Sequence, residues 1–100
     1  MNEYKRKRLA WILTKYPKTL REIIKLTDEY KSKYDIENEE LGDSEEELAL
    51  WQKHHDAMDK ILVPFMDEWV VSKHVALKYF QLAYKIAQKR MIKQEKTLKQ

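Results

Sequence analysis

Residues 72–91 read Ser72-Lys-His-Val-Ala-Leu-Lys-Tyr-Phe-Gln-Leu-Ala-Tyr-Lys-Ile-Ala-Gln-Lys-Arg-Met91 and decide the fold class of this chain. Apolar residues recur at every third or fourth position, which is the period of an α-helix. They fall on two sides of that helix: Val75, Tyr79, Leu82 and Ile86 on the first, and Phe80, Tyr84, Ala87 and Met91 on the second. A helix that is apolar on two sides is expected at the centre of a bundle or shared with a second chain.

A row of lysines separates the two apolar sides and consists of Lys78, Lys85, Lys89, Lys93 and Lys96. An unbroken helix from Phe65 to Thr97 would be about 50 Å long, whereas a compact domain of this size has a radius of gyration of about 13 Å. We therefore expect a break near 71–73, a frayed end after Ile92, or pairing with another copy.

The rest of the sequence predicts three further helices, so we expect one all-α domain, a small four-helix bundle over residues 1–100. The predicted helices span about 3–15, 19–34, 44–62 and 65–96. Capping boxes at Thr19–Glu22 and Ser44–Glu47 mark two of the starts. Short links favour antiparallel neighbours, above all for the first two helices, which meet at Pro17. Residues 35–43 are acidic, contain the single glycine and are predicted to be a linker within the domain.

The third helix is expected to bury one stripe of mainly apolar residues: Leu48, Trp51, His55, Met58, Leu62, Phe65 and Trp69. This stripe passes through Pro64, which removes a helical hydrogen bond and clashes with the preceding turn. Either one kinked helix crosses Pro64, or a new helix starts there with Pro64 as its first residue, and we favour a break or sharp kink. The simplest role of the aromatic and Met residues is core packing, and adaptable partner binding is the alternative.

The composition excludes several classes of protein. One Gly and two Pro are too few for the turns of an all-β fold, and the absence of Cys excludes disulfides and thiol chemistry. Uncharged runs are far shorter than the roughly 20 residues that span a bilayer. The first eight residues are charged and no apolar signal region follows. We expect a cytoplasmic protein without a membrane partner.

Charge is segregated along the chain. Residues 1–35 carry a net charge of +5, residues 36–71 a net charge of −9, and residues 72–100 a net charge of +7. The basic ends can pair with the acidic middle inside one fold, which is the interpretation we favour. The same layout can instead present a basic surface to phosphate or an acidic surface to a partner.

Catalytic and metal-binding motifs are weak. His55 and Asp59 have the spacing of two metal ligands on one helical face, but His55 also lies in the apolar stripe, where a core histidine is the ordinary role. The serines lie in no nucleophile motif, and there is no Gly-rich phosphate loop. We predict no enzyme activity, no metal site, no cofactor and no small-molecule substrate.

Basic patches are the strongest binding signals. The run Lys5, Arg6, Lys7 and Arg8 is one patch, and the lysine row Lys78, Lys85, Lys89, Lys93 and Lys96 is the other. Cations on one helical face bind phosphate through counterion release, and Trp11, off the buried stripe of its helix, can stack on a base or on a partner. A solvated helix face packed on the acidic middle is the alternative for both patches.

The stretch Arg8-Leu-Ala-Trp-Ile-Leu-Thr-Lys-Tyr-Pro-Lys-Thr-Leu-Arg-Glu-Ile-Ile-Lys-Leu26 resembles the N-terminal helical segment of small sigma-factor-like proteins, the late-gene transcriptional regulators of phages of Gram-positive bacteria. The resemblance covers about a fifth of the chain. It implies a phage or prophage regulator that binds DNA or polymerase. That family has a helix-turn-helix near its C-terminus, but Ser72–Arg90 lacks a turn between two short helices, so no recognition residues carry over. The departure also fits a protein that imitates or inhibits transcription machinery.

These observations predict a non-enzymatic regulatory or adaptor protein, phage or prophage encoded, that binds a protein partner or forms a homo-oligomer through its last helix. The first alternative is a DNA-binding transcriptional regulator that uses the basic helical faces. The second alternative is a phage structural or assembly protein.

Overall fold

The computed structural model describes residues 2–33 and 45–98, with the backbone alone for Lys33 and residues 95–98. The described chain forms four α-helices: α1 (Glu3–Lys15), α2 (Pro17–Lys33), α3 (Glu45–Trp69) and α4 (Lys73–Leu98). The predicted all-α class with four helices is confirmed, and no strand occurs in the described ranges. The predicted linker 35–43 lies outside the described residues.

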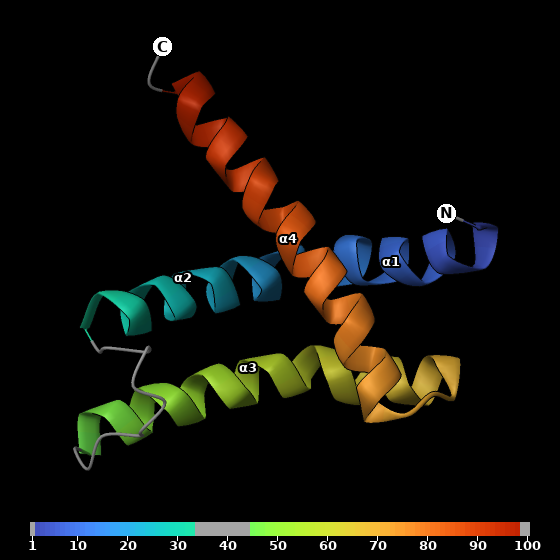
Figure 1. Cartoon of the computed structure of the whole chain (residues 1–100), viewed down its shortest axis with the longest axis horizontal. Coiled ribbons are helices and arrows are strands. Elements are labelled where there is room, and N and C mark those ends of the chain that lie inside the picture. Colours follow the sequence, from blue (N-terminus) through green and yellow to red (C-terminus); the bar gives the residue numbers. More distant parts are fainter. Residues whose placement is uncertain (1, 34–44, 99–100) are drawn as a thin grey trace.

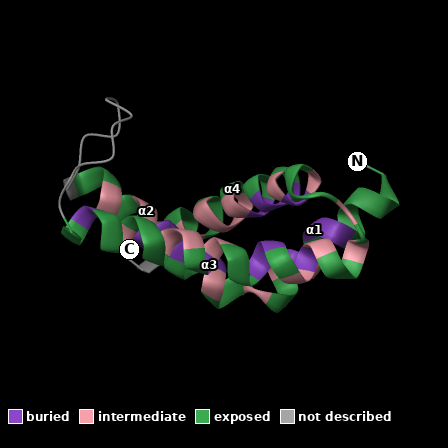
Figure 2. Cartoon of the chain, turned by 90° about the horizontal axis from the view of Figure 1, so that it is seen from below, coloured by how far each residue is buried: buried purple, intermediate pink, exposed green. Residues whose placement is uncertain are grey.

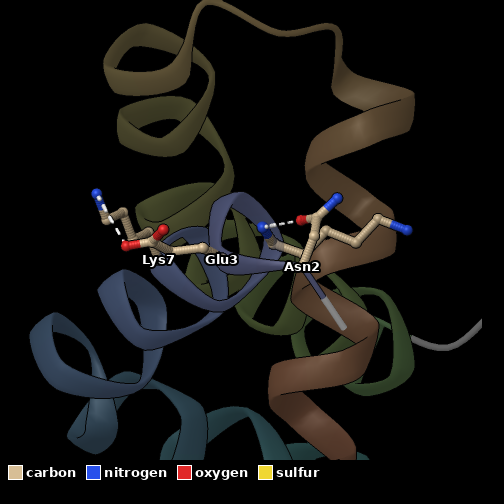
Figure 3. A network of polar contacts seen from close by, with 4 residues as sticks. Asn2, Glu3 and Lys7 are labelled. Atoms are coloured by element: carbon tan, nitrogen blue, oxygen red, sulfur yellow. Dashed lines mark hydrogen bonds and ion pairs between the residues drawn. The ribbon is translucent and has the colours of Figure 1, made fainter.

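α1 begins at the residue where the sequence predicts it. The side-chain oxygen of Asn2 accepts a hydrogen bond from the backbone N–H of Lys5 at 2.9 Å, which caps the helix. One turn further on, Lys7 and Glu3 form an exposed ion pair at 3.9 Å, and Figure 3 shows both contacts side by side. The exposed pair adds little to stability, so the cap is the feature that defines the start of α1.

The expected antiparallel pairing of the first two helices is wrong. α1 and α2 follow one another end to end, and only Tyr16 separates them (Figure 1). A link of one residue cannot turn the chain back, because helical hairpins need two to five residues. Pro17 is the first residue of α2, where its missing N–H leaves no helical bond unmade. Thr19 therefore lies inside α2, and the predicted capping box does not start that helix.

α3 continues through Pro64, so the predicted break at this proline is wrong and a single helix crosses it, as the alternative has it. Ile61, Leu62 and Phe65 flank the proline and are almost fully buried. Their packing outweighs the cost of about 3 kcal/mol that a proline imposes on a helix interior. Of the three outcomes expected for the long last segment, the break is observed: it falls at residues 70–72, and α4 continues to Leu98.

The corner between α3 and α4 is built from two cap motifs. Val70 has a φ of 51°, and the backbone N–H of Val71 bonds to the carbonyl of Met66 at 3.3 Å, which is the Schellman pattern at a helix C-terminus. Ser72 then starts α4, because its hydroxyl oxygen accepts a hydrogen bond from Val75 N–H at 3.3 Å. Val70 occupies a left-handed position that favours glycine.

α4 crosses the other helices obliquely and projects past α2 (Figure 1). Ala76 and Ala83 on its inner face are fully buried, and these small side chains let the backbones approach closely. Tyr79 and Phe80 are buried as well, so the predicted burial of α4 on two sides is confirmed for these residues. Leu82, which the sequence places in the first apolar stripe, is 42 % exposed.

The molecule is a flat slab of 44 × 41 × 21 Å. Its radius of gyration of 15.1 Å exceeds the value of about 13 Å for a compact chain of this length. The excess arises because α4 extends beyond the layer formed by α1, α2 and α3 (Figure 1). Figure 2 shows buried residues where the helices face one another and exposed residues along their outer sides.

Replacing Val70 with Gly should raise the free energy of unfolding by about 0.5–1 kcal/mol, because the left-handed conformation costs a β-branched residue more than the entropy that glycine loses. The Val70 side chain is 88 % exposed, so little packing is lost. Urea unfolding measures the change. The matched control is Val63→Gly, an exposed position inside α3, which should lower stability by about 1 kcal/mol. A destabilised Val70→Gly protein would contradict the left-handed backbone conformation of Val70.

Candidate functional site

A groove opens where α4 diverges from the junction of α1 and α2, and we call it the α2–α4 groove. It encloses about 210 Å³ and is lined by Leu13, Pro17, Leu20, Arg21, Ala87, Arg90, Met91 and Gln94. The α4 residues recur at helical spacing and so face the groove together. Leu20 is fully buried, and Leu13, Ala87 and Met91 are partly buried. The groove therefore has an apolar floor.

The rim of the α2–α4 groove is positively charged. Arg21 and Arg90 come from different helices and are both exposed, and neither has an ion-pair partner among the described residues. No acidic side chain lines the groove. The first turn of α2, which borders the groove, contains no acidic residue. The groove therefore favours an apolar group that carries negative charge beside it.

The lysine row of α4 faces solvent. Lys78, Lys85 and Lys89 are exposed and have no ion-pair partner in the described part of the chain. Lys93 is also exposed, and the side chain of Lys96 lies outside the described residues. The first three lysines thus form no ion pair with the described part of the acidic middle, residues 45–71; the remainder of that segment lies outside the described residues.

The four-residue basic run of α1 does not form one patch. Lys5, Arg6 and Lys7 are exposed, whereas Arg8 is buried with 9 % of its surface accessible. Successive helical residues turn by about 100°, so four in a row cannot share a face. Arg8 is four residues before Ile12 and four after Tyr4, and this spacing on the apolar stripe is the sequence signal that places Arg8 inside.

Arg8 lies in a cluster of three aromatic rings that joins α1, α3 and α4. Its guanidinium carbon lies 4.0 Å from the ring centroid of Tyr4, 5.3 Å from that of Tyr79 and 5.7 Å from that of Trp69. The guanidinium donates hydrogen bonds to the hydroxyls of Tyr79, at 3.5 Å, and of Tyr4. Burial alone would lower the pKa of Arg8, but the hydrogen bonds to Tyr79 and Tyr4, together with the charge interactions with the same two residues, raise the pKa above its ordinary value. The buried group stays charged.

Trp11 belongs to the edge of the core. Its ring packs edge-on against Phe65 with centroids 5.7 Å apart, and it lies 5.5 Å from the ring of Tyr16. The ammonium of Lys15 sits 4.9 Å from the Trp11 centroid on the outer side. Stacking of Trp11 on a nucleic-acid base, which the sequence allows, would have to replace these contacts.

The first half of α3 buries a different stripe from the predicted one. Leu48 is 46 % exposed and Trp51 is 38 % exposed, while Glu47 is buried and accepts a hydrogen bond from the hydroxyl of Tyr30 at 3.0 Å. The predicted core role of Leu48 and Trp51 is therefore wrong. A hydrogen-bonded Glu47 takes the inward position, which turns the two apolar side chains outward. We call the exposed side of this segment the acidic α3 face, and it carries Glu45, Leu48, Trp51, Gln52, His55, Asp56 and Asp59.

The histidines of α3 have separate surroundings. The ring of His55 stacks on Trp51 with centroids 4.3 Å apart. His54 is half-buried, and its Nε2 lies 3.0 Å from the hydroxyl of Thr27. That hydroxyl donates to the carbonyl of Ile23, so its oxygen accepts from His54. Burial, together with the neighbouring His55, lowers the pKa of His54.

No metal centre emerges from the described residues, in which no three His, Cys, Asp or Glu side chains converge. Among the described residues, no helix is both long enough and apolar enough to cross a membrane. No protein-family model, curated protein or solved structure matches the chain. Residues 73–98 form one uninterrupted helix, so the helix-turn-helix of sigma-factor-like regulators does not occur there.

Replacing Arg8 with Ala should lower the free energy of unfolding by about 2–3 kcal/mol, because three cation–π contacts disappear and the hydroxyl of buried Tyr79 loses its partner. Arg8→Lys should recover part of this loss, since lysine keeps the positive charge but lacks the planar guanidinium group. Chemical denaturation measures both. The matched control is Arg6→Ala, an exposed arginine on the same helix, which should change stability by less than about 0.5 kcal/mol. Equal effects at the two positions would contradict the role of Arg8.

Replacing His54 with Gln should reduce the loss of stability on acidification. The pKa of His54 is lowered in the fold, so the unfolded chain takes up the proton first as the pH falls. The free energy of unfolding should decrease as the pH drops from near 6.5 towards the lowered pKa. Urea unfolding at about pH 7.5 and about pH 5 compares the variant with the parent chain. His74→Gln, at an exposed position, is the control, and an identical loss in all three proteins would refute the expectation.

Proposed function

We propose that this protein is a non-enzymatic regulatory adaptor that binds an acidic, amphipathic segment of a protein partner in the α2–α4 groove. The observation that carries the proposal is the pair Arg21 and Arg90, two exposed arginines without ion-pair partners in the described chain, above an apolar floor. Arginine is the cation best suited to interface carboxylates, because its planar fork binds them bidentately.

The dimensions of the groove favour a side chain as the occupant. Its volume of about 210 Å³ lies below the roughly 300–1,000 Å³ of sites for small molecules. A leucine or an aromatic side chain from a partner helix can enter the floor between Leu20 and Met91. Carboxylates on the same partner helix then reach the arginines on the rim.

The groove offers binding groups rather than reactive ones. Its lining contains arginines and a glutamine but no His, Asp, Glu, Ser or Lys side chain that transfers protons or attacks a substrate. The lining thus supports an adaptor rather than an enzyme.

DNA binding is a second candidate function, and the outward lysine row of α4 favours it. Lys78, Lys85 and Lys89 are exposed on one side of a straight helix and lack ion-pair partners in the described chain. Such a row can neutralise backbone phosphates. The resemblance of residues 8–26 to phage transcriptional regulators supports the same candidate.

Fluorescence anisotropy tests the groove with a labelled helical peptide in which glutamates flank one leucine and one tryptophan. We expect micromolar binding that Arg21→Glu/Arg90→Glu weakens at least about tenfold, because two charge pairs become repulsive. The matched control, Arg6→Glu/Lys73→Glu, makes the same charge change at exposed sites away from the groove. It should weaken binding by less than about threefold, since only long-range attraction falls.

Equal weakening in both variants, or no peptide binding, would contradict the groove as the binding site. A duplex DNA in the same assay examines the second candidate. DNA becomes the better assignment if two results are obtained. The duplex must bind more tightly than the peptide, and the triple variant Lys78→Ala/Lys85→Ala/Lys89→Ala must reduce the slope of log binding constant against log salt concentration by about three.

A further inference from the structure

The acidic α3 face has the properties that the α2–α4 groove requires of its occupant. Leu48 and Trp51 supply exposed apolar bulk, and Glu45 and Asp59 lie on the same helical side at exposed positions. Neither carboxylate has an ion-pair partner among the described residues. No Lys or Arg interrupts the face, because Lys53 and Lys60 project from the adjacent side of the helix, about 100° away or more from its centre.

Within one molecule Leu48 and Trp51 are too far from the α2–α4 groove to enter it. The first half of α3 packs against the far end of α2, where Tyr30 bonds to Glu47. The groove lies at the other end of α2, between Pro17 and Arg21. Pro17 and Tyr30 are thirteen residues apart, which is about 20 Å along a helix. Insertion of either side chain into the groove must therefore join two molecules.

We infer that a second copy of this chain occupies the α2–α4 groove, and that it does so with its acidic α3 face. The inference rests on the proposed function of the groove and names its partner. Trp51 of one copy fills the apolar floor of the next, since it lies between Glu45 and Asp59, about 9 and 12 Å from them along the helix. The two carboxylates then pair with the long side chains of Arg21 and Arg90. Charge complementarity selects this occupant, because the basic groove and an acidic apolar helix face lie on the same chain.

The contact is head-to-tail, because different surfaces of the two copies meet. An open assembly of this kind keeps one free face at one end and one free groove at the other until a ring closes, so assembly grows with concentration. The pairing depends on four exposed charges, so added salt weakens it. Self-association should therefore rise with protein concentration and fall as the ionic strength increases.

Complementation of two charge-reversed variants tests the contact directly. The groove variant is Arg21→Glu/Arg90→Glu, which keeps a normal face, and the face variant is Glu45→Lys/Asp59→Lys, which keeps a normal groove. All four positions are exposed, so folding should be unchanged, and circular dichroism verifies this. Light scattering coupled to size exclusion, over about 10–500 µM, gives the mass of each protein and of their equimolar mixture.

The parent chain should form oligomers larger than a monomer, and each variant alone should stay monomeric. Their mixture should assemble again, because the acidic face of the groove variant matches the basic groove of the face variant, and the reversed basic face matches the reversed acidic groove. The control Arg6→Glu/Lys73→Glu should assemble like the parent chain. A monomeric parent with no assembly in the mixture, or variants that assemble as the parent does, would overturn the inference.

Failure of this inference is distinguishable from failure of the proposed function. The face variant has an intact groove, so it should bind the acidic peptide at least as tightly as the parent chain. If it binds the peptide while the mixture stays monomeric, the second copy is the wrong occupant and the adaptor proposal stands. If it binds no peptide, the groove itself is not a binding site.

Discussion

The buried guanidinium of Arg8 holds the corner at which three helices meet. Tyr4 comes from α1, Trp69 ends α3 and Tyr79 lies near the start of α4, and their rings surround a cation that no carboxylate of the described residues pairs with. Three π-faces and two hydroxyls take the place of a counterion. This cluster fixes α1 against the corner, and the tight turn at Val70 sends α4 obliquely away from it. The α2–α4 groove exists because α4 diverges from the layer that Arg8 anchors.

The helical class and the bounds of α1 could be predicted from the sequence, because the hydrophobic period and the proline after Tyr16 are local signals. The break near the last helix followed, as one of three outcomes, from the length of that segment. The rest depended on tertiary context. Pro64 stays inside α3 because buried neighbours on both sides outweigh its local cost. Arg8 looked like part of a basic surface, although its spacing from Tyr4 placed it on the apolar stripe. Leu48 looked like core, and only the contact of Glu47 with α2 shows which side of that segment faces inward.

The candidate site was the least predictable part of the molecule. Its lining joins residues from α1, α2 and α4 that are up to about eighty positions apart in the sequence. Neither Arg21 nor Arg90 belongs to a motif, and each looks like an ordinary solvated cation in its own helix. What distinguishes them is the apolar floor between them, which arises only when two helices diverge. The segregation of charge along the chain is evident from the sequence alone, whereas the placement of the helices decides which charged side chains face solvent.

Only Tyr16 separates α1 from α2, so the number of residues at this junction determines which side of α2 faces the interior. α1 ends at Lys15 and α2 begins at Pro17, so the rotation of one helix about its axis is inherited from the other through a single peptide unit. One inserted residue would turn α2 by about 100° and shift it by about 1.5 Å. Ile23 would then leave the interior and an exposed polar residue would enter it. The junction at Tyr16 therefore tolerates substitutions far better than insertions or deletions.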